Sequence, residues 1–418
     1  MLLKRVVVTG LGALTPLGNT TKQYWETLVA GKSGANLITK FDTTHYKTKF
    51  ACEVKNFDPT AFIEKKEVRK LDPFAQYAIA ASAEAIADAR LDSDDSINKN
   101  RVGVIWASGI GGLYTFQEQV TEYVNGGGHN PRFNPFFIPK MISDIAAGHI
   151  SMRYGFRGMN YSVTSACASS TNALIDSFNY LRLGKADVIV TGGSEAAVTE
   201  AGVGGFNAMK ALSERNDSPE TASRPFDLDR DGFVLGEGAG AIILEEREHA
   251  LRRGATIYAE LIGGGMSADA HHLTAPHPEG LGAVLVMQDA LNDAQLLPAD
   301  IDYINVHGTS TPLGDISEAK AIMQVFGEHA FSLNISSTKS MTGHLLGAAG
   351  AIEAIAAILA VHHNIIPPTI NHFTDDPSFD TRLNFTFNKA QERTIRAALS
   401  NTFGFGGHNA SVIYKKHS

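Results

Sequence analysis

Residues 161–184 read YSVTSACASSTNALIDSFNYLRLG, and this stretch decides the fold. Tyr161 to Ala166 has the character of a β-strand, and the segment after Cys167 reads as a helix whose first turn consists of Ala and Ser. A second stretch, Asn334 to Gly343, leads to His344 and another helix in the same way. Each predicts a strand, a sharp turn, a reactive side chain and a helix, so the chain is expected to contain two related halves.

The same rhythm recurs along the chain. Short apolar runs alternate with longer helix-like segments, at Arg5–Thr9, Arg101–Trp106, Asp187–Thr191 and Ile301–His307. This pattern predicts an α/β fold in layers, with sheets buried on both faces. The charged segment EEREHALRRGA, residues 245–255, is the expected boundary, giving halves of about 1–253 and 254–418.

Composition excludes several classes of protein. The net charge of −8 argues against general nucleic-acid binding, and two cysteines are too few for a disulfide framework. The N-terminus lacks the features of a signal peptide, and the apolar stretch Ala348–Val361 is too short to span a bilayer and contains Glu353. We therefore expect a cytoplasmic enzyme without a membrane segment.

Four motifs resemble cofactor or metal sites but lack a required residue. VVVTGLGALTPLG has Thr15 at the third glycine of a dinucleotide loop, and GKS at 31–33 has no preceding glycine or strand for a phosphate loop. DLDRDG at 227–232 has Gly238 where a calcium loop needs glutamate, and the histidines at 271, 272 and 277 lie in a predicted loop. The sequence predicts no cofactor and no metal.

Cys167 is the candidate nucleophile. At a helix N-terminus the helix dipole and free N–H groups favour the thiolate, so we expect a thiol pKa below its usual value of about 8.5. The alternative is a buried structural cysteine, which is the interpretation that we give to Cys52 in the run FACEV.

Three further elements carry candidate chemistry. VHGTSTPLGD ends a predicted strand at His307, STKSMTGHLLGAAGAIEA places Lys339, His344 and Glu353 around a turn, and NTFGFGGHNAS is a glycine-rich loop. Two histidines on matching strand ends, combined with an activated cysteine, favour covalent catalysis. The glycine-rich loop can bring a backbone N–H close to a thioester oxygen.

Together these elements resemble the β-ketoacyl-acyl carrier protein synthases of the thiolase superfamily, and the order Cys, His, His identifies the elongating class. Within it the chain is similar to synthase II of bacterial fatty-acid synthesis. The resemblance runs from VVVTGLGALTPLG through SACASS, RPFDLDRDGFVLGEGA and KSMTGHLLGAAG to NTFGFGGHN, nearly the full length. It implies the thiolase-like fold, duplicated halves in five αβαβα layers, a homodimer, and decarboxylative Claisen condensation with malonyl-acyl carrier protein.

The resemblance also implies roles for individual residues. Cys167 takes the acyl group, and its N–H and that of Phe405 form the oxyanion hole. His307 and His344, as neutral imidazoles, bind the malonyl thioester carbonyl and stabilise the enolate. Lys339 and Glu353 fix the histidines, with Asp315 a weaker candidate for that task.

Substrate and carrier contacts follow from the same resemblance. Thr309 and Thr311 match contacts of the phosphopantetheine arm. Ile110 matches a position that lines the acyl pocket, where the size of its side chain should influence chain length. Phe405 matches the gate of that pocket, and Phe403 is a further expected substrate-binding residue. Basic residues that are expected to dock the acidic acyl carrier protein are Lys65, Lys66, Arg69, Lys70 and Lys210. The alternative for the first four is a solvated helix face. The Gly-, Pro- and Phe-rich segment Asn125–Pro139 is expected to be an ordered excursion at a partner interface.

Four other classes of protein share some of these features. A thiolase needs a second cysteine near the C-terminus, where the chain reads NTFGFGGHN, and an initiating synthase carries Asn in place of His344. A noncatalytic chain-length partner subunit loses the nucleophile, whereas Cys167 is present. A stand-alone polyketide ketosynthase has the same catalytic residues and stays the alternative.

Overall fold

The structure is a computed structural model, and it describes residues 3–417. Ten strands form one sheet in the order β10-β9-β13-β14-β8-β1-β7-β6-β4-β5. The strands of the N-terminal half are β1 (Val6–Leu14), β4 (Val102–Ala107), β5 (Asn160–Val163), β6 (Val188–Glu195) and β7 (Gly238–Glu246). Those of the C-terminal half are β8 (Ala259–Ala268), β9 (Tyr303–Asn305), β10 (Asn334–Ser336), β13 (Ala397–Gly404) and β14 (His408–Lys415). Two small pairs lie apart, β2 (Asn36–Leu37) with β3 (Phe50–Ala51) and β11 (Ile365–Ile366) with β12 (Gln391–Glu392).

The two halves have the same strand order. Numbered within its own half, each sheet runs first, fifth, fourth, second, third, and the first strands, β1 and β8, pair with each other and join the halves. In both halves the fifth strand is antiparallel to its neighbours, whereas the fourth, second and third strands are parallel. The predicted duplication is therefore present in the topology.

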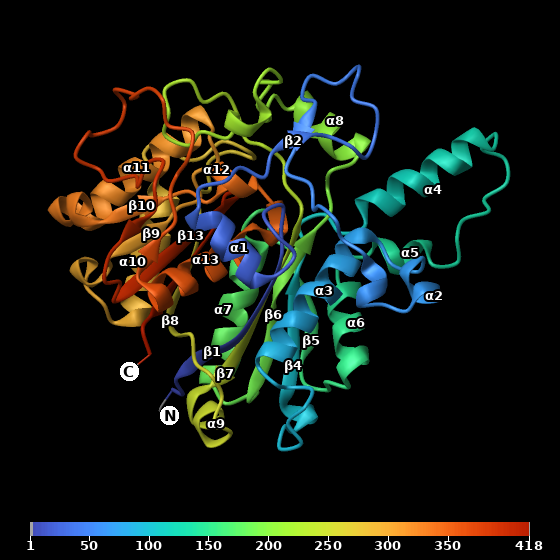
Figure 1. The fold of residues 1–418 in the computed structure, drawn as a ribbon, viewed down its shortest axis with the longest axis horizontal. Coiled ribbons are helices and arrows are strands. Elements are labelled where there is room, and N and C mark those ends of the chain that lie inside the picture. Colours follow the sequence, from blue (N-terminus) through green and yellow to red (C-terminus); the bar gives the residue numbers. More distant parts are fainter. Residues whose placement is uncertain (1–2, 418) are drawn as a thin grey trace.

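Helices cover both faces of each half-sheet, which produces the five layers (Figure 1). Between the half-sheets lie α7 (Ser169–Arg182) and α13 (Ala349–His363), which contact strands of both halves. The outer layers are α3 (Pro73–Asp88) and α6 (Ile145–Tyr154) on one side, and α10 (Leu281–Ala294) and α11 (Pro312–Phe326) on the other. The predicted α/β fold in five layers is confirmed.

The central helix α13 is apolar because all of its faces are covered. Every residue of α13 from Ala349 to Val361 is buried, as expected for a helix that packs on all sides. A Cβ at Gly350 would lie 2.2 Å from Oγ1 of Thr171 on α7, so glycine permits this close packing. By length and mean hydropathy, 1.5, the stretch Leu346–His363 could cross a bilayer, but 89% of it is buried in the interior.

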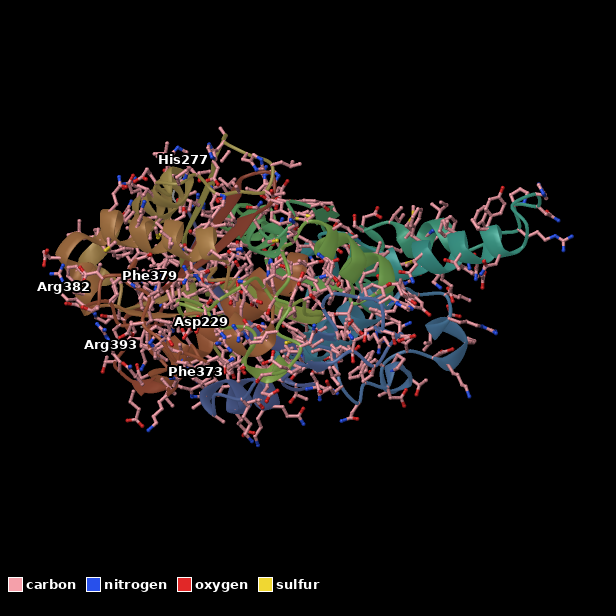
Figure 2. The ribbon with its side chains drawn as sticks, turned by 90° about the horizontal axis from the view of Figure 1, so that it is seen from above. Asp229, His277, Phe373, Phe379, Arg382 and Arg393 are labelled. Atoms are coloured by element: carbon pink, nitrogen blue, oxygen red, sulfur yellow. The ribbon has the colours of Figure 1, made fainter. Side chains whose placement is uncertain are left out.

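The remaining helices surround this core, except for α12, which is buried within it. They are α1 (Thr21–Val29), α2 (Lys65–Val68), α4 (Leu113–Asn125), α5 (Phe137–Met141), α8 (Glu200–Ala208), α9 (Arg247–Arg252) and α12 (Lys339–Thr342). Figure 2 shows α4 and the chain that returns from it extending away from the body, on the side opposite His277, Phe379 and Arg382. The expected excursion at Asn125–Pro139 is therefore the tip of a projecting α4–α5 hairpin.

Some element boundaries differ from those expected. The strand expected at Ile301–His307 is shorter, Tyr303–Asn305, and the one expected from Asn334 ends at Ser336. Lys339–Thr342 then forms the helical turn α12, and α13 begins five residues after His344.

Candidate active site

Cys167 lies between the end of β5 and the start of α7. Ala166 before it has a φ of +51°, and Ala168 after it is the N-cap of the helix. Ser169 stabilises the turn, because its hydroxyl accepts from the N–H of Ser165 at 2.8 Å and donates to the carbonyl of Ala166 at 2.6 Å. The sharp turn directs a nearly buried thiol, 6% exposed, to the end of the sheet.

His344 follows β10, the strand equivalent to β5 in the other half. Its Nε2 lies 3.0 Å from the sulfur of Cys167. The backbone of His344 pairs with the segment before β7: its N–H donates to Val234 at 2.7 Å, and its carbonyl accepts from Gly236 at 2.9 Å. The RPFDLDRDGFVLGEGA motif thus contributes the support that fixes this histidine.

His307 follows β9, and its ring meets that of His344 edge to face, with centroids 5.3 Å apart. Glu318 on α11 holds the backbone here: its carboxylate accepts from the N–H groups of His307, at 2.9 Å, and Gly308, at 2.8 Å. The sequence analysis missed Glu318. The available signal was a carboxylate on a helix face that otherwise packs into the core, eleven residues after His307.

Lys339 and Glu353 form a fully buried ion pair behind the histidines. Neither residue lines the cavity described below. Burial raises the pKa of Glu353 to about 7, and the Lys339 charge opposes that rise. Lys339 also lowers the pKa of both imidazoles, so it acts on them through its charge.

The electrostatics of the site correct one expectation. The Cys167 pKa is not lowered: burial raises it to about 12, which outweighs the opposing effects of Lys339 and of the N–H of Phe405. Desolvation disfavours the thiolate more than nearby dipoles favour it. Burial likewise holds the pKa of both histidines well below the ordinary value, so both rings are neutral near pH 7. The resting site therefore holds a neutral thiol beside a neutral base.

The glycine-rich loop between β13 and β14 reaches the thiol. The backbone N–H of Phe405 lies near enough to the thiol of Cys167 to lower its pKa, against the larger opposing effect of burial. A Cβ at Gly404 would lie 2.7 Å from the carbonyl oxygen of Ser165 and 3.1 Å from the nitrogen of Cys167, so only glycine lets the loop approach this closely. The ring of Phe403 lies 5.6 Å from that of His307.

One cavity, of about 580 Å³, contains these groups. Cys167, His307 and His344 line it together with both phenylalanines of the loop. Sequence-predicted residues that also line it are Ile110, Thr309, Thr311 and Lys210. The two threonine hydroxyls lie 3.0 Å apart and can bind polar groups of a ligand arm. Such a cavity can hold a thioester between a thiol, two imidazoles and an N–H donor.

The basic residues of α2 and its C-terminal end lie outside this cavity. Lys65, Lys66 and Arg69 are exposed, and Lys70 is half-buried. Lys66 pairs with Glu64 at 2.9 Å, and Lys70 pairs with Glu67 at 2.8 Å, so part of the positive charge is neutralised locally.

Asp315 lies away from both imidazoles. Its carboxylate accepts from the N–H of Phe226 at 3.0 Å and lies 3.5 Å from Arg230. Burial raises its pKa to about 6. It fastens the RPFD segment to the start of α11 and so supports the loop that carries the two threonines.

Comparison with known proteins decides the family. The model described as "Beta-ketoacyl synthase, N-terminal domain" matches residues 3–250, and "Beta-ketoacyl synthase, C-terminal domain" matches residues 258–373. The chain belongs to the β-ketoacyl synthase family. This synthase is accordingly an enzyme of the acyltransferase class, and the resemblance inferred from its motifs is confirmed.

Curated relatives and solved structures agree. The synthase is 47% identical over 414 residues to the 3-oxoacyl-[acyl-carrier-protein] synthase 2 of Synechocystis sp., covering 99% of this chain and 98% of that one. It is 48% identical over 413 residues to the protein of the same name from Staphylococcus aureus, with the same coverage. A β-ketoacyl synthase from Burkholderia phymatum superposes with a TM-score of 0.92 at 35% identity, over 99% of this chain and all of the other. A type II polyketide ketosynthase in complex with its acyl-carrier protein gives 0.92 at 34% identity, over the whole of both chains.

Proposed function

We propose that this synthase elongates acyl chains in fatty-acid biosynthesis, by acyl transfer to Cys167 and decarboxylative condensation with malonyl-acyl carrier protein. One observation carries the proposal: Nε2 of His344 lies 3.0 Å from the sulfur, inside a cavity that His307 also lines. The halves 1–253 and 254–418 would contribute the nucleophile and the two imidazoles respectively.

The first half-reaction is acyl transfer. The thiol of Cys167 passes its proton to His344 as the sulfur attacks the thioester carbonyl, and the N–H groups of Cys167 and Phe405 stabilise the resulting oxyanion. The carbon–sulfur bond to the carrier breaks, and the leaving thiolate takes the proton back from His344. The products are an acyl-enzyme, a free carrier thiol and a neutral imidazole.

The second half-reaction is condensation. His307 and His344, the latter after proton exchange has placed its proton on Nε2, donate hydrogen bonds to the malonyl thioester carbonyl, so the electron pair that remains after carbon dioxide leaves is stabilised as an enolate. The enolate carbon attacks the acyl-enzyme carbonyl, and Cys167 leaves as a thiolate, which takes up a proton. The product is a β-ketoacyl thioester on the carrier. Neutral rings suit this step, since the developing charge lies on oxygen.

A Cys167→Gln variant tests the assignment. Glutamine has no nucleophilic sulfur, but it leaves both imidazoles in place, so we expect elongation to be lost and decarboxylation of malonyl-acyl carrier protein to be retained. Product analysis would measure the first, and carbon dioxide release the second. The matched control is Cys52→Ala, which removes the buried sulfur outside the cavity and should still elongate. Elongation by the Cys167→Gln variant would refute the acyl-enzyme route.

We propose the acyl carrier protein as partner, with Thr309 and Thr311 binding the amides of its phosphopantetheine arm. Lys210 at the cavity mouth and the exposed bases of α2 would bind its acidic surface. Lys66→Glu combined with Arg69→Glu should raise the KM for the carrier more than it lowers kcat. Steady-state kinetics with purified carrier would measure this, and Lys22→Glu, an exposed lysine on α1, is the control. An unchanged KM would remove α2 from the interface.

We also propose that the synthase is a homodimer and acts in the cytoplasm. The third strand, β5, lies at one end of the sheet and leaves that edge open within residues 3–417. In the same half of the chain, the α4–α5 hairpin exposes Tyr114, Phe116, Val124, Phe133, Phe136 and Ile138. Pairing of two β5 edges across a twofold axis would cover both features, and an uncovered apolar patch of this kind marks an interface.

A stand-alone polyketide ketosynthase is the second candidate. The match to a polyketide ketosynthase at a TM-score of 0.92 supports it, whereas identities of 47% and 48% to synthases named for acyl-carrier-protein substrates support the first. Reaction with saturated acyl carriers of graded length separates them, because the fatty-acid enzyme extends such chains and the polyketide enzyme extends β-keto chains.

A further inference from the structure

Glu195, the last residue of β6, is a fully buried carboxylate that the proposed chemistry does not use. Its Oε2 accepts from the backbone N–H groups of Gly109, at 2.8 Å, and Gly347, at 3.0 Å. Its Oε1 accepts from the N–H of Ile110, at 3.2 Å, and the hydroxyl of Ser108, at 3.1 Å. Burial raises the pKa of Glu195 to about 7, and these donors oppose the rise. The carboxylate therefore joins two segments that are far apart in the sequence.

The two segments pack closely against each other around the carboxylate of Glu195. One is the loop Ser108–Gly111, and the other is the 3-10 turn Leu346–Ala348 that follows His344. A Cβ at Gly347 would lie 2.2 Å from the nitrogen of Gly109, and a Cβ at Gly109 would lie 2.7 Å from Oε2 of Glu195. Backbone contacts backbone here, so the position of each segment depends on the carboxylate that both bind.

Both segments form the cavity wall beside the thiol. Ile110 and Leu346 line the cavity together with Cys167, whereas Glu195 does not line it. The carboxylate of Glu195 therefore lies in the protein interior, separated from the cavity by the residues that line it. We propose that Glu195 is a positioning residue that sets the location of the Ile110 loop and thereby the acyl-chain length that the cavity accepts. This inference rests on the proposed acylation of Cys167.

A carboxylate is the side chain that fits four donors. Each of its oxygens accepts two hydrogen bonds at once, whereas a glutamine amide has one oxygen and an NH₂ group that only donates. Whichever way a Glu195→Gln amide is turned, at least one backbone N–H would face the NH₂ group. Because the loop lies between the carboxylate and the cavity, this repulsion would push Ile110 into the cavity. Long acyl chains should then lose more affinity than short ones.

The test is acyl transfer to Cys167 from acyl carrier proteins that bear a short and a long saturated chain. For Glu195→Gln we expect the ratio of kcat/KM, long over short, to fall about tenfold relative to the unsubstituted chain, the size of effect that one unpaired buried donor produces. The change should appear in KM for the long chain rather than in kcat. Glu245→Gln, at the far end of β7, makes the same chemical change at a buried carboxylate and should leave the ratio unchanged.

Ser108→Ala is the companion variant: it removes one of the four donors to Glu195 and leaves the three backbone bonds, and it also removes the hydroxyl that accepts from the N–H of Gly111 in the same loop, at 3.0 Å. It should shift the ratio in the same direction by a smaller factor, and it keeps the test available if Glu195→Gln fails to fold. A ratio equal to that of the unsubstituted chain in the folded variants overturns the role of Glu195 alone. Failure of the unsubstituted chain to take any acyl group onto Cys167 overturns the proposed function itself.

Discussion

At the scale of single residues, the active site depends on imidazoles that stay neutral. Burial and the Lys339 charge both oppose protonation of His307 and His344, which lowers their pKa. The unfolded chain takes up protons on these rings near pH 6.5, whereas the folded chain does not. Their contribution to stability is therefore fully present above about pH 6.5 and is lost as the pH falls below that value.

The same shifts predict the pH dependence of decarboxylation. The rate should stay level as the pH falls from about 8 to about 6.5, and the acid limb should lie below the ordinary histidine pKa. Lys339→Gln removes a charge that opposes protonation, so its acid limb should move to higher pH. Carbon dioxide release by the Cys167→Gln background measures the profile. The control is the double variant Lys339→Gln with Glu353→Gln, which leaves no unpaired buried charge. If the acid limb of the pH profile stays at the same pH in the single and the double variant, Lys339 has no electrostatic role.

Which residues meet at the site was predictable, but their electrostatics were not. Cys167, His307 and His344 were identified because each follows a strand and precedes a helix in a recognisable motif. The pKa of Cys167 was predicted in the wrong direction, because it is desolvated by residues such as Ala197, Phe233 and Leu346, which only the fold brings beside it. Glu318 and Glu195 were missed for the same reason, since their partners are backbone N–H groups of distant segments.

At the scale of elements, the turn between α12 and His344 has little space. Gly343 has a φ of +67°, and a Cβ there would lie 2.9 Å from both the sulfur of Cys52 and the carbonyl oxygen of Val234. Val234 also accepts from the N–H of His344, so a shift of this turn moves the catalytic ring.

Gly343→Ala should therefore lower both stability and turnover. We expect a loss of about 1–3 kcal/mol in the free energy of unfolding from strain and crowding together, measured by denaturant titration, with a fall in kcat. Gly254→Ala is matched, because its φ is +64° and the structure describes no atom within 4 Å of that Cβ. The control should lose stability through strain alone and keep its kcat. Equal effects of the two substitutions would contradict the packing argument.

Element boundaries were only partly predictable. The sequence predicts a strand and a sharp turn over Asn334–Gly343 and not the short helix α12, because Asn334–Ser337 has strand character and nothing local marks where it ends. The start of the helix is set by tertiary packing of Lys339 against Glu353, two residues fourteen positions apart. Such a pairing leaves no trace in a short sequence window.

At the scale of the whole molecule, the open β5 edge and the hairpin predict the state of assembly. Phe133→Asp with Ile138→Asp puts charges on the exposed face of the hairpin, so the double variant should sediment as a monomer, whereas the unsubstituted chain sediments as a dimer. Leu297→Asp, a position that is 70% exposed elsewhere on the surface, should stay dimeric. Sedimentation velocity measures all three, and a dimeric hairpin variant would place the interface elsewhere.

The duplication of the fold was predictable, but the order of its strands was not. The recurring strand, turn and helix around Cys167 and His344 gave two related halves, because each unit is encoded locally. The order within each sheet depends on pairings such as Val6 with Leu261 and Val104 with Val190, which join residues far apart in the chain. Periodicity reports which residues are buried and not which strand lies beside which.

The central position of α13 also matters while the chain is being made. The helix α13 is buried only when both half-sheets have formed. It is nevertheless synthesised before β13 and β14, two strands of the C-terminal half-sheet that it contacts. Until then the segment Leu346–His363 of the nascent chain lacks part of its packing partners. Its mean hydropathy of 1.5 is high enough for a helix that crosses a membrane. We therefore expect chaperones to bind residues 346–363 on the ribosome-bound chain, and aggregation to be most pronounced until β13 and β14 have been made.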